Sequence, residues 1–249
     1  MRIVARAGIM LFGLAAMAWA AMVLPGFLRD QTLISMGNAL ERGENYTFPV
    51  LFSQINTVPS SDEFGFCKAA ARRANMIVLI KIIEDPSVVD NRTLKDTAWQ
   101  KLQDATHALL ECSPADSLGW LALFWLNMSK NGYAPEYGNY LQLSYDASPN
   151  EAAVALWRNR IVLGLYDRLP SRFSDLAIRE FIKLVNSERL YTEMGDIFER
   201  APPALQFRLS LALKTAESRP REVLTKMLQD RGVHAPASEP SPVVDRPWK

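Results

Sequence analysis

An uninterrupted apolar run close to the start of the chain constrains this sequence more than any other feature. Residues 7–24 contain no charged side chain, and Arg2 and Arg6 precede them. An α-helix of that length spans about 27 Å, close to the roughly 30 Å hydrocarbon core of a bilayer. No polar stripe interrupts the run, which argues against a helix buried in a globular core. The run therefore predicts a transmembrane helix within residues 1–28.

A cleaved secretory signal is the alternative interpretation of this segment. Ala18 and Ala20 would form the small-x-small cleavage site of such a signal. Cleavage there would leave the apolar residues 21–28 on the mature chain, which favours an uncleaved anchor. Because positive charge precedes the run, the positive-inside bias places the amino terminus in the cytoplasm. We therefore expect a single-pass inner-membrane protein whose carboxy-terminal domain lies in the periplasm.

Composition and charge exclude several classes of function. The 28 basic and 27 acidic residues give a net charge of +1, whereas a nucleic-acid-binding protein usually has a strong basic excess. His107 and His234 are the two histidines, and there is no Cys-x-x-Cys pair, which argues against a metal site. No glycine-rich phosphate loop occurs either. We expect neither a nucleic-acid partner nor a cofactor.

The two cysteines, Cys67 and Cys112, are candidates for a disulfide bond. Both lie in the part of the chain expected outside the cytoplasm, where oxidation is permitted. A disulfide would close a loop of about 45 residues. In the chain-entropy model, closing such a loop stabilises the folded state by roughly 4 kcal/mol. Both residues also lie in apolar helical contexts, so two buried free thiols are the alternative. The sequence leaves the choice open because it does not give the distance between the two Cα atoms.

The chain after the anchor reads as helical nearly throughout. Apolar side chains recur at helical spacing, and no segment shows the sustained alternation that is typical of a strand. We expect a juxtamembrane helix and connector in residues 29–60, an all-α domain over residues 61–232, and a disordered proline-rich tail at 233–249. The domain would begin with a helix capped by Ser61.

Turn residues divide this region into separate helices. Prolines and capping residues stand at the expected boundaries, where a missing backbone N–H costs little. Asp30 is predicted to cap a helix that leaves the membrane. The predicted helices cover residues 30–43, 61–84, 91–111, 116–131, 135–146, 150–166, 171–186, 188–200, 203–217 and 220–231.

Two stretches of this region resemble one another at a distance of 35 residues. Residues 111–116 (ECSPAD) recur as residues 146–151 (DASPNE), each time between two apolar helices. A helix-stopping proline at this period, with Trp120 six residues after the first one, resembles the tetratricopeptide repeat. Phe124 and Asn127 depart from that pattern, since they stand where the repeat has Gly and Tyr. The resemblance implies an α-solenoid-like stack of helical hairpins.

A longer block, residues 117–160, is similar to membrane-anchored helical proteins of bacterial polysaccharide-export loci. The block carries no motif of known chemistry. The similarity implies a role in the assembly or export of envelope polysaccharide, with contact to the polysaccharide itself as a further possibility.

Catalytic patterns are scarce. No Gly-x-Ser-x-Gly elbow is present, and Cys112 and His107 point about 140° apart if they share a helix. Some all-helical enzymes cleave sugars with two carboxylates, which must lie about 5–10 Å apart in an aromatic cleft. The candidates are the pair Asp62–Glu63, which capping explains, and an acidic stripe formed by Glu193, Asp196 and Glu199, which reads as a solvated helix face.

Aromatic side chains give the better functional lead. They are concentrated between residues 120 and 166, where most are expected to fill the gaps between stacked hairpins. Trp and Tyr also suit binding surfaces, because they combine a flat apolar face with a hydrogen-bonding edge. The residues predicted to line a partner-binding groove are Trp125, Tyr133, Tyr137, Arg158 and Arg160, the two arginines pointing in different directions.

These observations together predict a noncatalytic membrane-anchored scaffold or adaptor. It would bind a protein partner of the cell envelope in a concave helical surface, and residues 7–28 would hold it in the membrane. An enzyme that acts on cell-envelope glycans through paired carboxylates is the alternative.

Overall fold

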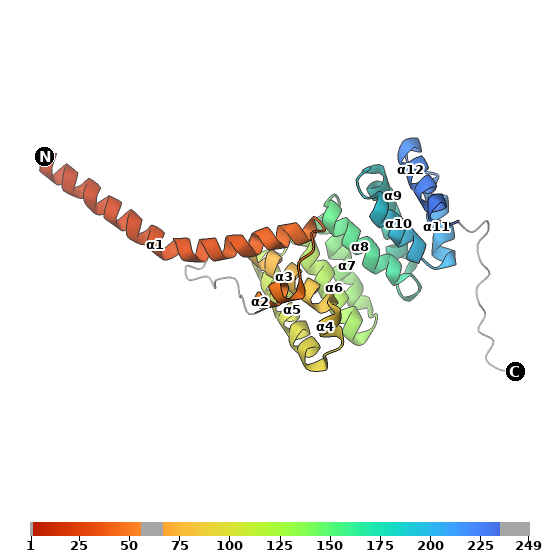
Figure 1. The fold of residues 1–249 in the computed structure, drawn as a ribbon, viewed down its shortest axis with the longest axis horizontal. Coiled ribbons are helices and arrows are strands. Elements are labelled where there is room, and N and C mark those ends of the chain that lie inside the picture. Colours follow the sequence, from red (N-terminus) through yellow and green to blue (C-terminus); the bar gives the residue numbers. More distant parts are fainter. Residues whose placement is uncertain (1, 56–66, 235–249) are drawn as a thin grey trace. The chain divides into compact units, whose positions relative to one another are not determined.

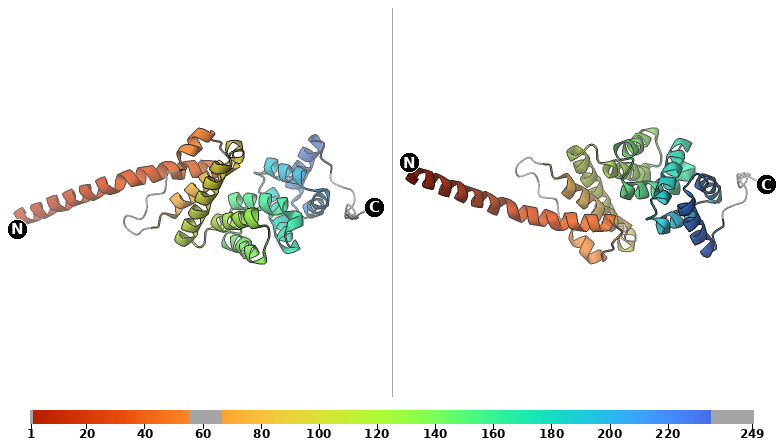
Figure 2. Two further views of the ribbon diagram at one scale, coloured as in Figure 1. Left: turned by 90° about the horizontal axis from the view of Figure 1, so that it is seen from below. Right: turned by 90° about the horizontal axis from the view of Figure 1, so that it is seen from above.

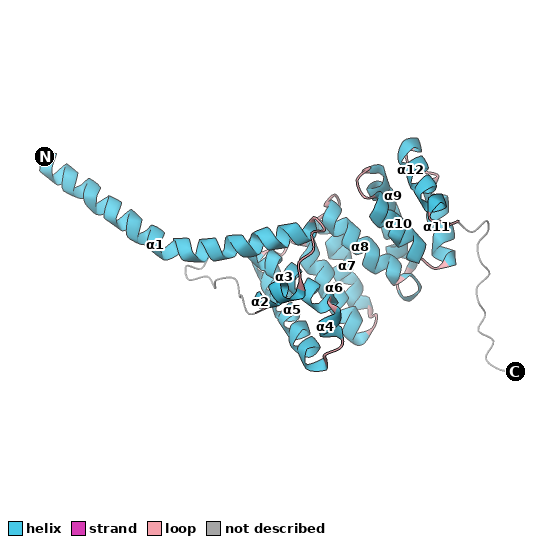
Figure 3. Cartoon of the chain, viewed as in Figure 1, coloured by secondary structure: helices cyan, strands magenta, loops and turns pink. Residues whose placement is uncertain are grey.

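The computed structural model describes residues 2–55 and 67–234, and every regular element in these two ranges is a helix (Figure 3). The prediction of an all-α chain is confirmed for this part of the sequence. The elements are α1 (Arg2–Glu41), α2 (Phe48–Ser53), α3 (Ala69–Glu84), α4 (Pro86–Val89), α5 (Arg92–Cys112), α6 (Ser117–Asn131), α7 (Pro135–Ala147), α8 (Ala152–Gly164), the 3₁₀ turn η1 (Tyr166–Arg168), α9 (Ser171–Asn186), α10 (Tyr191–Arg200), α11 (Pro203–Leu213) and α12 (Ser218–Asp230).

The chain divides into two compact units inside α6. The first unit ends at Leu126 and the second begins at Asn127. This division falls within the stretch 61–232, for which the sequence predicts a single helical domain. The predicted helix start at Ser61, the pair Asp62–Glu63 and nearly all of the predicted tail lie outside the described residues.

Helix α1 is one continuous helix rather than the two helices that the sequence predicts. It runs through the expected boundary at residues 28–29, and Pro25 lies in its interior. Proline lacks the backbone N–H that an interior helical position needs, so a bend is expected there, and Figure 1 draws α1 bent along its course. Asp30 was predicted as a helix cap, but it lies inside α1, where it is buried and accepts a hydrogen bond from Lys68 Nζ at 2.7 Å.

The two halves of α1 have opposite surroundings. The amino-terminal half extends away from the other helices of the first unit (Figure 2), and its large apolar side chains are exposed, including Phe12 at 78 % and Trp19 at 63 %. Beyond Asp30 the same helix enters the core, where Leu33 and Leu40 are 1 % and 4 % exposed. The change occurs within about one helical turn of Leu28, which is 57 % exposed.

None of the helices, as far as their residues are described, combines the length with the hydropathy that a membrane crossing needs. The transmembrane assignment of residues 1–28 therefore stays a prediction.

Helix α3 is the centre of the first unit. Its side chains are buried almost all round, as is expected of a helix enclosed by neighbours rather than lying at a surface. On one side it contacts α1, through the pair Lys68–Asp30 and through Arg73, whose Nε donates to Glu41 Oε1 at 2.9 Å. On the other side Arg72 Nη1 donates to the Ala108 carbonyl of α5 at 3.1 Å. The second half of α1 is thus part of the core of the folded unit.

Gly37 allows α1 and α3 to approach closely. A Cβ atom placed on Gly37 would lie 2.6 Å from the Cβ of Ala74, closer than real Cβ atoms approach other atoms. Because Ala74 is on the facing helix and is buried, the clash can be relieved only by moving the two helices apart.

Replacing Gly37 with alanine is therefore expected to lower the free energy of unfolding by about 1–3 kcal/mol, the usual cost of overpacking a core. Chemical denaturation of the purified chain measures the loss. Gly164→Ala is the matched control, because a Cβ at Gly164 meets no atom within 4 Å. An equal loss in both variants would contradict the close helix contact.

The second unit is built from α7 to α12. Helix α9 carries the most regular apolar stripe, and buries Phe173, Phe181 and Val185 completely. Helices α8, α10, α11 and α12 pack against α9, so that α9 is the central helix of this unit. Leu205, Leu209 and Leu224 supply buried side chains from α11 and α12.

The two similar stretches of sequence form the same turn. Residues 113–116 join α5 to α6, and residues 148–151 join α7 to α8. The first residue of each turn has nearly the same backbone conformation, with φ −139° and ψ 82° at Ser113 and φ −150° and ψ 79° at Ser148. The repeated sequence thus has a repeated local structure, which is compatible with the predicted helical hairpins.

Candidate functional site

The predicted binding residues Tyr133 and Tyr137 lie at the start of α7 in the second unit. Tyr137 is half-buried, and its hydroxyl accepts a hydrogen bond from Asn131 Nδ2 at 3.2 Å. Its ring is stacked with that of Tyr140, with centroids 6.4 Å apart. Tyr133 is also half-buried, and its hydroxyl lies beside Gly138, where a Cβ would be 3.0 Å away. Tyr133 therefore packs on α7, whereas Tyr137 shares a surface with Tyr140.

Leu143 extends this surface by another step along α7. Tyr137, Tyr140 and Leu143 follow one another at intervals of three residues, which makes them neighbours on a helix. Leu143 is 41 % exposed, which is unusual for a large apolar side chain in this unit. We call these three residues the α7 surface. Tyr140 and Leu143 were absent from the predicted site, although their spacing from Tyr137 is visible in the sequence.

Trp125 lies in the first unit and has an aromatic partner there. Its ring is 5.1 Å from that of Trp99, between α6 and α5. Both side chains are half-buried. The ring of Trp99 thus covers part of the surface of Trp125, as expected of aromatic residues that pack between helices.

The two predicted arginines of α8 have very different surroundings. Arg160 is exposed and remains available to a partner. Arg158 is completely buried, so it lies in the core and not in a groove. The prediction that Arg158 lines a partner-binding groove disagrees with this position, because a side chain with no exposed surface does not touch a docked partner.

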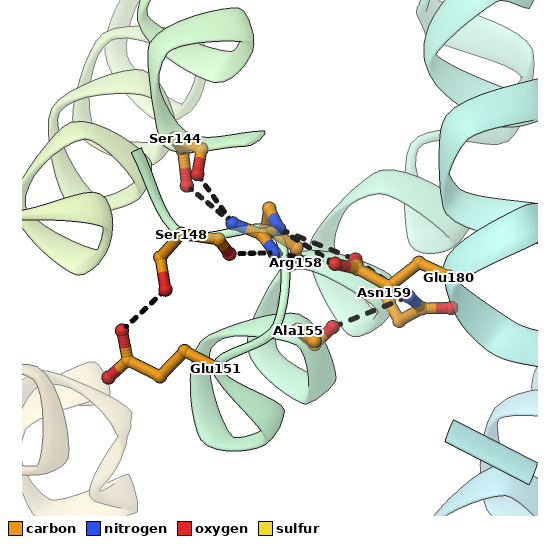
Figure 4. Close-up of polar contacts among 7 residues, drawn as sticks. All are labelled: Ser144, Ser148, Glu151, Ala155, Arg158, Asn159 and Glu180. Carbon is orange, nitrogen blue, oxygen red and sulfur yellow. Dashed lines mark hydrogen bonds and ion pairs between the residues drawn. The ribbon is translucent and has the colours of Figure 1, made fainter. Parts of the chain in front are cut away.

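Arg158 is at the centre of a buried polar cluster, which Figure 4 shows. Its Nη1 donates to the Ser144 carbonyl at 2.6 Å, and its Nη2 donates to the Ser148 carbonyl at 3.1 Å. These carbonyls lie at the carboxy-terminal end of α7, which has no helical partners for them and attracts positive charge. Arg158 therefore caps α7 from the neighbouring helix.

Glu180 of α9 neutralises this buried cation. Its carboxylate accepts hydrogen bonds from Arg158 Nη2 at 2.5 Å and Nε at 3.2 Å, and from Asn159 Nδ2 at 3.0 Å. With Ser144 Oγ as a further acceptor at 3.3 Å, all five N–H donors of the guanidinium have partners. The ring of Tyr145 lies 4.6 Å below the guanidinium carbon. The cluster links α7, α8 and α9, and all the guanidinium donors of Arg158 are used within it.

Burial also affects the acid–base properties of the cluster. It raises the pKa of the Glu180 carboxyl above its ordinary value of 4.5, while the hydrogen bonds and charge of Arg158 and the hydrogen bond from Asn159 act in the opposite direction. Burial similarly raises the pKa of the Tyr145 hydroxyl, and Glu180 adds to this effect. Glu180 therefore binds a proton more readily in the folded chain than in the unfolded chain.

This difference predicts a pH dependence of stability. A carboxyl with a raised pKa in the folded state contributes stability that is complete below pH 4.5 and is lost as the pH rises through its folded pKa. The unfolding free energy of the natural chain is expected to fall, relative to that of a Glu180→Gln variant, as the pH rises above about 4.5. Denaturation curves of both chains across this range measure it, and a relative rise would contradict the assigned direction.

The two cysteines are brought together in the first unit. Cys67 lies two residues before α3 and Cys112 ends α5, and the structure joins them in a disulfide with Cα atoms 5.5 Å apart. Cys67 is exposed, whereas Cys112 is half-buried.

The predicted acidic stripe of α10 is engaged in ion pairs. Arg231, just after α12, lies 2.7 Å from Asp196 and 3.6 Å from Glu199. The stripe therefore joins α10 to α12 in addition to facing solvent. Among the described residues, the buried carboxylates are Asp30 and Glu180, which belong to different units, and no group of His, Cys, Asp and Glu has an arrangement suited to a metal ion.

Comparisons of the chain with known protein families, with curated proteins and with solved structures find no match.

Proposed function

We propose that this chain is a noncatalytic scaffold that is anchored in the inner membrane and binds a protein partner of the bacterial cell envelope. Its folded units would lie in the periplasm, with the amino terminus in the cytoplasm. The resemblance of residues 117–160 to proteins of polysaccharide-export loci directs the proposal toward the assembly or export of envelope polysaccharide.

The observation that carries this proposal is the contrast within α1. A soluble helix with Phe12, Trp19 and Leu28 all more than half exposed would leave a large apolar surface in water, which soluble monomers rarely do. Insertion of this half of α1 into a bilayer would cover that surface. Because α1 continues without a break into the core at Leu33, the anchor and the first unit are one piece. Anchoring raises the effective concentration of the folded units near membrane partners.

The α7 surface is the binding site that we propose for the partner. Tyr137 and Tyr140 present stacked aromatic faces with hydroxyl groups, and Leu143 adds exposed apolar area. Tyrosine is enriched at protein interfaces because it contributes both kinds of contact at a small cost in conformational entropy. Arg160 is a further exposed candidate in the same unit.

A glycan-acting enzyme is the alternative, and the carboxylates support it less well. Such an enzyme needs two acids about 5–10 Å apart in an aromatic cleft. Asp196 and Glu199 are instead paired with Arg231, and Glu180 is held by Arg158 in the core. These positions favour the scaffold.

Site-specific photo-crosslinking in intact cells tests the proposed binding site. A photoreactive phenylalanine derivative at Tyr137 is expected to give a discrete adduct with one envelope protein. The same substitution at Tyr191, a half-buried tyrosine of α10, is the matched control and should give no such adduct. The binding site is refuted if Tyr137 gives no adduct, or if both positions capture the same set of proteins.

A further inference from the structure

The Cys67–Cys112 disulfide is one of three contacts that attach the start of α3 to the other helices of the first unit. Cys67 is fixed to the end of α5, and the next residue, Lys68, forms an ion pair with Asp30 of α1 at 2.7 Å. One turn later, Arg72 donates to the Ala108 carbonyl of α5. The start of α3 is therefore attached to α5 and to α1 within six residues.

Among these contacts, the ion pair between Lys68 and Asp30 is the one that involves α1. The Asp30 carboxylate is only 6 % exposed, so it requires a cation close by. The Lys68 side chain is itself 40 % exposed, and the disulfide at the preceding residue fixes the backbone from which its ammonium group reaches Asp30. Closing the disulfide therefore also holds the cation against the buried carboxylate of the anchor helix.

We propose that Cys67 is the site at which a protein disulfide oxidant of the outer compartment closes this bond, and that closure secures the start of α3 to the anchor helix. The proposal rests on the proposed function in one respect, since a cytoplasmic location would keep both thiols reduced. The protein that would react with Cys67 is a thiol–disulfide exchange protein. It is a separate partner from the one proposed to bind the α7 surface.

The order of the two chemical steps follows from the exposure of the two cysteine residues. The Cys67 thiolate attacks one sulfur of the oxidant's disulfide, which forms a mixed disulfide and releases the oxidant's other sulfur as a thiolate. The Cys112 thiolate then attacks the Cys67 sulfur, forms the bond within the chain, and releases the oxidant's second thiolate. Two protein thiols are oxidised and one oxidant disulfide is reduced to two thiols, which take up the two protons. Cys67 is the entry point because it is exposed, whereas Cys112 is half-buried.

Two single variants of the full-length chain in its native membranes test the entry point. Cys112→Ser leaves Cys67 without its resolving partner and is expected to accumulate a higher-mass adduct that a reductant removes. Cys67→Ser is expected to accumulate several-fold less. Equal amounts of adduct in the two variants, or more with Cys67→Ser, would overturn the assignment of Cys67.

Two further measurements complete the test. The natural chain, once denatured, is expected to react with a maleimide-coupled polymer only after reduction. Labelling of both cysteines without a reductant would overturn the proposal.

Hydrogen exchange at residues 30–41 should become faster after reduction, because the disulfide secures the start of α3 to the anchor helix. Unchanged exchange would overturn this structural effect of the disulfide.

The fate of the anchor is measured separately. The Cys67→Ser/Cys112→Ser variant should remain in carbonate-washed membranes, because its apolar helix is intact. A natural chain that is oxidised but released from membranes would refute the proposed anchoring and leave the disulfide assignment standing.

Discussion

Replacing Arg158 with alanine is expected to lower the free energy of unfolding by about 3–5 kcal/mol, the usual cost of removing one partner from a buried ion pair. The change leaves the Glu180 carboxylate buried without its cation, and leaves the carbonyls of Ser144 and Ser148 without their donor. Since a domain of this size is usually stable by only about 5–15 kcal/mol, the second unit would be close to unfolding. Chemical denaturation followed by circular dichroism measures the loss.

Arg160→Ala is the matched control for this variant. It removes the same side chain two residues further along α8, at an exposed position where a substitution usually changes stability by no more than about 0.5 kcal/mol. If Arg158 were a partner-binding residue rather than a core residue, its loss would weaken partner binding and leave stability almost unchanged. Losses of similar size at the two positions would contradict the buried cluster.

Deleting residues 1–41 is expected to prevent the first unit from folding, whereas deleting residues 1–28 is expected to leave it folded. The longer deletion removes Leu33, Met36 and Leu40, all of them buried. Truncating one such side chain to alanine typically costs about 2–5 kcal/mol, so losing all three would exceed much of the stability of a domain. The shorter deletion removes residues whose described large side chains are exposed.

Both truncated chains are compared after purification under oxidising conditions, so that the disulfide can form in each. Near-ultraviolet circular dichroism of the first unit, which contains Trp99 and Trp125, reports whether its side chains have fixed surroundings. Equal signals from the two chains would contradict a core that includes the second half of α1.

The sequence predicts the helices well where a local pattern determines them. The prediction of residues 171–186 coincides with α9, since its apolar stripe is regular and Pro170 precedes it. Residues 91–111 are displaced by one residue from α5, where the Asn91 side chain caps the helix by accepting from Leu94 N–H at 3.1 Å. In these helices the signals for the start, the end and the buried face agree.

The helix break predicted between residues 28 and 30 is absent from the structure, because a contact between residues far apart in the sequence stabilises a continuous helix there. Pro25, Gly26 and Asp30 form a sequence that is typical of a helix break and a new cap. In the structure the carboxylate of Asp30 pairs with Lys68, which is 38 residues further along the chain. Packing against α3 therefore stabilises a continuous helix at a position where local preferences favour a break.

The contact between Arg158 and Glu180 could not be predicted either, because it also joins residues that are far apart in the sequence. Arg158 and Glu180 are 22 residues apart and belong to different helices. One signal was nevertheless present, because Glu180 stands seven residues after the buried Phe173 and three after the buried Ala177, on the apolar face of α9. A charged residue on such a face requires a buried partner of opposite charge. An arginine within the apolar segment of α8 is the residue that meets this requirement.

The central claim is that α1 anchors the folded units in a membrane, and fractionation after an alkaline carbonate wash tests it most directly. The full-length chain is predicted to remain in the membrane pellet, and a chain that lacks residues 1–28 is predicted to appear in the soluble fraction. Release of the full-length chain by carbonate, to the same extent as the truncated chain, would contradict the claim.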